Sequence, residues 1–133
     1  MKATLFEKYS VLFKALTFIF VIATVLLHLT ISEEYWWYLA LLFSAVMNLV
    51  YPIQAFQKNR SFGKEIHIAA TLILISISGV LWYPPLLIGA IGFHGIWDWC
   101  KHKGLGVSFP RWYPPICAIY DFAYCFFMLS FWL

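Results

Sequence analysis

Three side chains able to bind a proton or a metal ion are spaced four residues apart in the segment FHGIWDWCKHK, residues 93–103. They are His94, Asp98 and His102. In a helix, each four-residue step turns the side chain by about 40°, so all three share one face. His94 and Asp98 can therefore hold one ligand together. His94 and His102 are about 12 Å apart along the axis and cannot bind the same metal ion in an unbroken helix.

Imidazole and carboxylate groups at this spacing support three kinds of chemistry. They can ligate a divalent metal ion such as zinc or iron, they can pass protons near neutral pH, or they can orient a polar ligand. The sequence holds no HExxH motif, no repeated histidine box and no GxSxG segment, so no specific enzyme class is indicated. Whether the protein is an enzyme stays open at this point.

The composition of the chain shows which elements must position these residues. Of its 133 residues, 63% are hydrophobic and only 11% are charged, whereas a soluble domain has about 25% charged residues. In water, a chain of this size has too much surface to cover with so few charges. We therefore expect the lipid bilayer to surround it. The basic residues are too sparse for a nucleic-acid site.

Five segments are long and apolar enough to be membrane spans, which need about 17–25 residues. The expected spans are residues 11–31, 35–56, 66–83, 85–102 and 114–132. Short polar or proline-containing connections separate them, and proline suits the first turn of a helix. The sequence thus predicts one all-helical, membrane-embedded domain over residues 1–133.

The basic residues predict the orientation of this bundle, because Lys and Arg favour cytoplasmic loops. With five spans and a cytoplasmic N-terminus, all nine basic residues fall on the cytoplasmic side. They are Lys2, Lys8, Lys14, Lys58, Arg60, Lys64, Lys101, Lys103 and Arg111. The outer side then carries Glu33 and Glu34, and the C-terminus lies outside.

In this topology, four helices bring an unusual polar side chain to a similar depth in the cytoplasmic half of the membrane. The candidate ligand-binding residues are Asn48, His67, His94, Asp98 and Asp121, with His102 at the mouth of the site. Ionisable groups within a membrane are costly and often mark function. His94, Asp98 and Asp121 are the candidate metal ligands and, in an enzyme, the candidate catalytic residues.

Small residues in the fourth span predict close helix packing around this site. Gly89, Gly92 and Gly95 recur there, and small residues let helices in membranes approach closely. The three cysteines give no disulfide framework, because their number is odd and no two are closely spaced. We expect them to be reduced.

The segment HGIWDWCKHKGLGVSFPRWYPPICAIYD resembles a pattern in a family of small bacterial multi-pass membrane proteins, over roughly residues 90–125. In that pattern an HGxWD helix end precedes a histidine, a Pro-Arg-Trp-Tyr-Pro loop and a span bearing Asp. The matching residues are His94, Trp97, Asp98, His102, Pro110, Trp112, Tyr113, Pro114 and Asp121. The resemblance implies a helical fold and a location in the bacterial inner membrane, but no activity.

Three functions are compatible with this sequence. The first is a ligand-binding or accessory subunit whose His/Asp cluster holds a small ligand or a partner membrane subunit. The second is a membrane enzyme that uses a divalent metal ion held by His94, Asp98 and Asp121, with His67 as a further candidate ligand. The third is a small proton or solute translocator.

Overall fold

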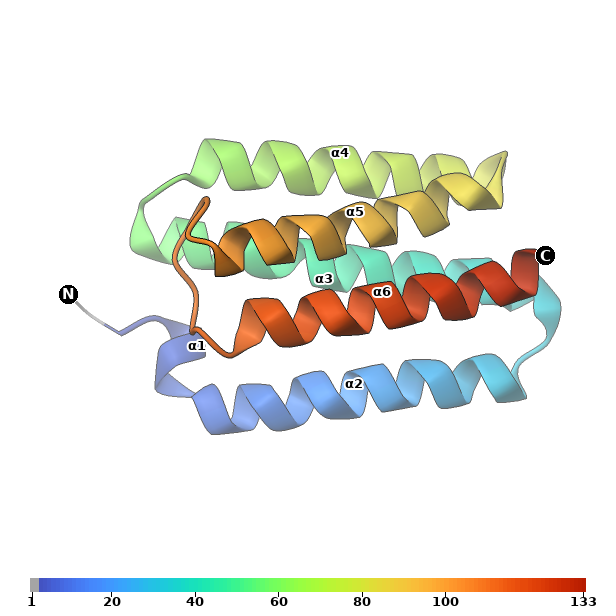
Figure 1. The fold of residues 1–133 in the computed structure, drawn as a ribbon, viewed down its shortest axis with the longest axis horizontal. Helices are drawn as coiled ribbons and strands as arrows, with labels where there is room; N and C mark the ends of the chain where they lie inside the picture. Colours follow the sequence, from blue (N-terminus) through green and yellow to red (C-terminus); the bar gives the residue numbers. More distant parts are fainter. Residues whose placement is uncertain (1–2) are drawn as a thin grey trace.

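The computed structural model describes residues 3–133 as a bundle of helices without strands (Figure 1). A short helix α1 (Leu5–Lys8) precedes α2 (Ser10–Thr30). A 3-10 turn η1 (Glu33–Tyr35) leads into α3 (Trp36–Lys58). The chain continues through α4 (Phe62–Leu81), α5 (Pro84–His102) and α6 (Tyr113–Trp132). The prediction of an all-helical bundle is confirmed.

Within residues 3–133, four helical segments are long and apolar enough to cross a membrane. They are Ser10–Thr30, Glu33–Lys58, Phe62–Leu81 and Tyr113–Trp132. They indicate a membrane protein. Helix α5 lies where the fourth span was expected, but it is less apolar because it carries His94, Asp98 and Lys101, all of which are buried inside the bundle. A fifth crossing by α5, and the orientation of the bundle, stay predictions.

The helix boundaries follow from residues that start or stop helices. Pro84 and Pro85 open α5, and Pro114 and Pro115 lie in the first turn of α6, where a missing backbone N–H costs little. Helix α3 ends at Lys58, and the next residue, Asn59, caps it in a left-handed conformation.

Helix α5 lies between α4 and α6 and packs mainly against these two, while α2 lies at the edge of the bundle (Figure 1). Glycines allow these close contacts. A Cβ atom on Gly79 of α4 would lie 2.5 Å from the backbone nitrogen of Leu87, and one on Gly95 would lie 3.1 Å from the Cβ of Asp121. Gly89 faces open space, so the expectation that it mediates packing is wrong.

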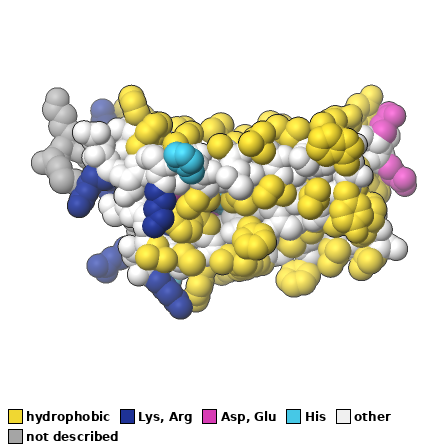
Figure 2. All heavy atoms as spheres, turned by 90° about the horizontal axis from the view of Figure 1, so that it is seen from above, with side chains coloured by type: hydrophobic (Ala, Val, Ile, Leu, Met, Phe, Trp, Pro, Cys, Tyr) yellow, Lys and Arg dark blue, Asp and Glu magenta, His cyan; other side chains and the backbone are white. Residues whose placement is uncertain are grey.

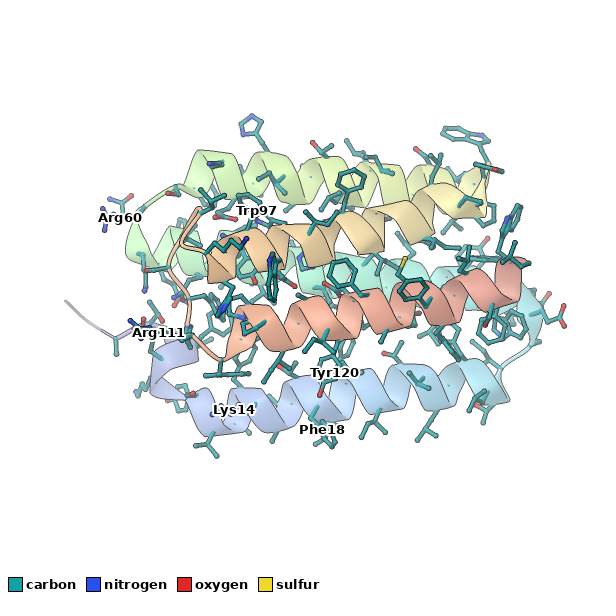
Figure 3. The ribbon with its side chains drawn as sticks, in the orientation of Figure 1. Lys14, Phe18, Arg60, Trp97, Arg111 and Tyr120 are labelled. Atoms are coloured by element: carbon teal, nitrogen blue, oxygen red, sulfur yellow. The ribbon has the colours of Figure 1, made fainter. Side chains whose placement is uncertain are left out.

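The face shown in Figure 2 is apolar along the length of the bundle, with charged residues at its ends, and each of the long helices carries exposed hydrophobic side chains. Lys14, Arg60 and Arg111 lie at the end that also holds the connection between α5 and α6 (Figure 3). We call it the basic end. Glu33 and Glu34 are exposed in the turn between α2 and α3, at the opposite end.

Candidate functional site

The structure brings three candidate residues together inside the bundle. The Nδ1 atom of His94 lies 2.7 Å from Oδ2 of Asp121 and 3.6 Å from Oδ2 of Asp98. None of the three residues has more than 2% of its surface exposed. Each residue offers a ligand atom, and these atoms lie within 4.8 Å of one another. We call these three residues the His/Asp site.

Neighbouring turns of α5 and a close approach of α6 build the His/Asp site. His94 and Asp98 face the same way because they are one helical turn apart. Asp121 reaches them because Gly95 has no side chain, which lets α6 come close. A larger residue at position 95 would push Phe122 and Asp121 away from α5.

A tyrosine from α3 completes the His/Asp site. Tyr51 is 2% exposed, and its hydroxyl donates a hydrogen bond to Oδ1 of Asp98. Its ring stacks against that of His94, with 6.0 Å between the ring centroids and 24° between the ring planes. Tyr51 is not predicted from the sequence, because tyrosine is common in apolar spans. The available signal was its spacing of three residues from Asn48, which places both on one face of α3.

Several polar atoms of the site are buried without a hydrogen-bond partner among the described residues. They are Nε2 of His94, Oδ2 of Asp98 and Oδ1 of Asp121. Buried polar atoms in proteins nearly always have a partner, because an unmet group costs free energy. The site therefore has unused capacity to bind a proton or a cation.

The space beside the site is small. His94 lines a narrow crevice between α3, α4 and α5, together with Asn48, Tyr51 and Glu65. The crevice is too tight for a water-sized sphere. In this conformation the site therefore has no room for an organic ligand, whereas an ion coordinated directly by the side chains needs no separate cavity.

Distances within the site suit metal coordination. With metal–ligand bonds of about 2.1 Å, the two measured separations correspond to angles of about 80° and about 118° at a shared ion. The ideal ligand–metal–ligand angles of octahedral and of tetrahedral coordination both lie between these two values. The ligand atoms lie up to 4.8 Å apart, whereas two ligand atoms on one ion can be at most about 4.2 Å apart, so the side chains must close by about 0.6 Å or more when an ion binds.

A second buried charged cluster lies next to the His/Asp site. The carboxylate of Glu65 on α4 accepts hydrogen bonds from the Lys101 ammonium, from the Trp97 indole at 3.3 Å and from the backbone N–H of Val107 at 2.8 Å. Glu65 is 1% exposed and Lys101 is 7% exposed. We call these contacts the Glu65 latch. Lys101 was expected on the cytoplasmic side with the other basic residues, but the structure buries it.

Tyr51 connects the two clusters. The ammonium group of Lys101 lies 4.3 Å from the centroid of the Tyr51 ring and 4.8 Å from the Trp97 ring. Such contacts attract a cation to the face of an aromatic ring. Because the hydroxyl of Tyr51 also binds Asp98, this one side chain contacts both clusters.

Two predicted site residues lie elsewhere. His67 is exposed, and its Nδ1 contacts the carbonyl of Gly63 on its own helix. Because Glu65 faces inward, a residue two positions later points to the opposite side of the helix. His102 is also exposed, with its ring 5.6 Å from that of Trp99. Each four-residue step along α5 turns the side chain a little further round the helix, so His102, two steps after His94, no longer faces the site. Lys101, seven residues after His94, points inward instead.

Asn48 is buried, but its hydrogen bonds belong to the contact between α3 and α4 and not to the His/Asp site. Its amide donates to the carbonyl of Ser44 at 2.8 Å, and Ser44 pairs with Ser76 of α4 at 2.8 Å. Another histidine, His28, pairs with the hydroxyl of Tyr124 at 3.2 Å and with the carbonyl of Thr24. The three cysteines, Cys100, Cys117 and Cys125, are free.

Comparisons of the chain with family models, with curated proteins and with solved structures give no match. The resemblance of residues 90–125 to small bacterial membrane proteins stays a prediction from the motif.

Proposed function

We propose that this chain is a multi-pass membrane protein that binds a single divalent metal ion between His94, Asp98 and Asp121. The observation that supports it best is the meeting of one imidazole and two carboxylates, with unpaired oxygen atoms, at a fully buried point. This is the ligand-binding function expected from the sequence, with an ion as the ligand.

Charge balance favours a divalent cation. Two ionised carboxylates and a neutral imidazole carry two negative charges, and isolated charges are expensive to bury away from water. A divalent ion cancels both charges. The set of one nitrogen and two oxygen ligands suits zinc, manganese or ferrous iron.

Three protein ligands leave at least one coordination position free, as in catalytic rather than structural zinc sites. This supports the metal-dependent enzyme as a development of the same proposal. Its substrate would need access that the tight crevice does not give in this conformation.

One observation favours a second candidate, a proton-binding site. The 2.7 Å separation of His94 and Asp121 is a normal hydrogen-bond length. Two protons held within the cluster can therefore also balance its two negative charges, as in proton relays within membranes. This candidate is the translocator expected from the sequence.

The proposal includes five membrane crossings with the N-terminus in the cytoplasm. The apolar outer surface and the separation of charges to opposite ends support it (Figure 2). The His/Asp site then lies in the cytoplasmic half of the membrane.

Metal content and metal titration test the proposed function. The protein is purified in detergent without chelator, its metals are measured by mass spectrometry, and the metal-free protein is titrated separately with Zn²⁺ and Mn²⁺. We expect one ion per chain, and a loss of affinity of about 100-fold or more for Asp121→Asn and His94→Gln. His28→Gln, a buried histidine outside the site, is the matched control and retains affinity.

The result that contradicts the metal proposal is equal, weak binding of both ions by the parent chain and by Asp121→Asn. In that case, infrared spectra decide on the proton candidate. A carboxylic acid C=O band that is lost in Asp121→Asn supports a protonated cluster.

A further inference from the structure

We infer that Glu65 is a positioning residue that controls access of the cation to the His/Asp site from the basic end. It does so by holding down residues 105–109, which we call the strap. The inference rests on the proposed function for the identity of the ion, but its main test does not need a metal.

The strap is held on its inner side by one carboxylate. Val107 of the strap is 4% exposed, and its backbone N–H donates to Glu65 at 2.8 Å. The strap lies so close to the latch at Gly106 that an added Cβ atom would collide with Glu65 and lie 2.7 Å from the Lys101 ammonium. Gly106 also has φ +72°, a conformation that other residues rarely adopt.

Two further contacts hold the outer part of the strap to α3. The amide of Gln54 donates to the carbonyl of Ser108 at 3.2 Å, and the ammonium of Lys58 donates to its hydroxyl at 3.1 Å. The bond from Gln54 is neutral and modest in net strength, and the bond from the charged Lys58 lies at the exposed surface, where solvent screens it. Glu65 is therefore the main attachment, because its buried, charged carboxylate accepts from Val107 of the strap and is itself held by Lys101 and Trp97 of α5.

The strap covers the side of the His/Asp site that faces the basic end. Phe109 packs edge-on against Tyr51, with 5.3 Å between the ring centroids, and in a tilted arrangement against Tyr113 at 4.6 Å. Tyr51 in turn holds Asp98. On α5, Lys101 lies one turn nearer the basic end than Asp98. An ion that approaches from that end must pass the strap and the latch before it meets Asp98.

Lys101 acts as a tethered cation in this arrangement. Its ammonium neutralises Glu65 and contacts the faces of Tyr51 and Trp97 while the strap is closed. When Lys101 leaves, the Glu65 carboxylate is free to attract an incoming ion. When the strap closes again, Lys101 returns and excludes water from the path. The latch thus sets how fast an ion exchanges, rather than how tightly it is bound.

Two native cysteines serve as reporters of strap opening. Cys117 is fully buried on α6, one turn beyond Tyr113. Cys125 lies two turns further along α6 and is partly exposed. We compare a chain that keeps only Cys117 with one that keeps only Cys125, the other two cysteines being replaced by Ser in each. A small water-soluble thiol reagent is applied under native conditions.

Glu65→Gln keeps the shape of the side chain but removes its charge. Hydrogen bonds to charged groups contribute about 1.5–3 kcal/mol, which corresponds to about 10- to 100-fold in an equilibrium. We therefore expect Cys117 to react at least about tenfold faster, and the Val107 amide to exchange its hydrogen faster, while the reaction of Cys125 does not change. If both cysteines react faster by the same factor, the bundle has loosened as a whole and the inference is overturned. It is also overturned if neither cysteine reacts faster.

Gly106→Ala is a second variant for the case that Glu65→Gln fails to fold. It keeps the charges but collides with the latch, and Gly104→Ala is its matched control. Gly104 also has a positive φ, of 96°, but a Cβ atom there meets open space. Faster reaction of Cys117 in Gly106→Ala alone supports the strap; equal behaviour of the two variants contradicts it.

Metal exchange gives the readout that links the strap to the proposed function. With Zn²⁺ as the probe, Glu65→Gln should raise the association and dissociation rates together by about tenfold, with affinity changed by less than about twofold. A faster dissociation with an unchanged association rate, and hence a lower affinity, overturns the access role. If the parent chain binds no Zn²⁺, the proposed metal site fails, and the cysteine experiment still decides whether Glu65 holds the strap.

Discussion

Tyr51 of α3 donates its hydroxyl hydrogen to Oδ1 of Asp98 of α5, although 47 residues separate them in the chain. Through this contact, α3 takes part in a site whose other members come from α5 and α6. The same ring lies beneath the ammonium of Lys101. Tyr51 is thus the residue at which the His/Asp site and the Glu65 latch meet.

Tyr51→Phe removes the hydroxyl and leaves Oδ1 of Asp98 buried without a donor. We expect a loss of unfolding free energy of about 1–3 kcal/mol, the usual cost of an unmet buried polar group. The measurement is denaturant unfolding in a fixed detergent. Tyr38→Phe, at an exposed tyrosine of α3, is the control and should change stability little. Equal stabilities for the two variants would show that the Tyr51 hydrogen bond contributes nothing net.

The helices and the central pair of the site follow from simple patterns in the sequence. Long apolar segments predict the helices, and the four-residue spacing of His94 and Asp98 predicts their shared face. The depth of Asp121 could be estimated from the helical rise, because α5 and α6 are linked by a short connection at one end of the bundle.

The latch could not be predicted in the same way. Lys101 lies at a helix end among other basic residues, where Lys ordinarily extends to the headgroups. Its burial depends on Glu65 facing it from α4, and the rotation of one helix against another is decided by packing. His67 is predicted as a site residue from its depth in the membrane. Depth alone does not tell which side of a helix faces inward.

Glycine substitutions should rank by the space that each glycine leaves for its neighbours. Gly79→Ala should destabilise most, because its Cβ atom would lie 2.5 Å from the backbone of Leu87. Gly95→Ala comes next, with flexible neighbours at 3.1–3.3 Å, and Gly92→Ala should be nearly neutral, with one contact at 3.4 Å. Overpacking usually costs about 1–3 kcal/mol.

Thermal unfolding in detergent checks this ranking. Gly89→Ala, which meets open space, is the matched control and should melt like the parent chain or slightly higher, since Ala favours helix. A Gly79→Ala variant that melts with the control would show that α4 and α5 are not packed as closely as described.

Glu7 should make stability depend on pH at the basic end. Its carboxylate accepts one hydrogen bond from the Lys58 ammonium, with 2.9 Å between nitrogen and oxygen, and another from the backbone N–H of Thr4. These contacts hold the pKa of Glu7 below its ordinary value of 4.5. Because the pKa is lower in the folded state, the stabilising contribution is fully present above about pH 4.5. This contribution is lost as the pH falls through the lower pKa that Glu7 has in the folded state.

Unfolding of the parent chain and of Glu7→Gln should therefore differ at neutral pH and converge in acid. The difference is small, since Glu7 is partly exposed and its ion pair is screened. Glu34→Gln, an exposed residue at the opposite end of the bundle, is the control and should show no such convergence. If the unfolding free energies of the parent chain and of Glu7→Gln differ by the same amount at every pH, the charge of Glu7 is not involved.

The membrane crossing of α5 can be tested at its two ends. Tyr83 precedes the helix and is 53% exposed, and Lys103 follows it and is also exposed. The 19 residues of α5 span about 28 Å, close to the roughly 30 Å of a bilayer core. If α5 crosses, Tyr83→Cys and Lys103→Cys should react with an impermeant thiol reagent from opposite sides, with Lys103→Cys cytoplasmic.

Ser32→Cys and Asn59→Cys, which flank the η1–α3 segment, provide the reference for a full crossing. They should also react from opposite sides, with Asn59→Cys on the same side as Lys103→Cys. The parent chain, tested alongside, gives the reaction of the native cysteines. Labelling of positions 83 and 103 from the same side would reduce α5 to a helix that enters without crossing. The His/Asp site would then be approached from one face only, which excludes the translocator but leaves a metal site intact.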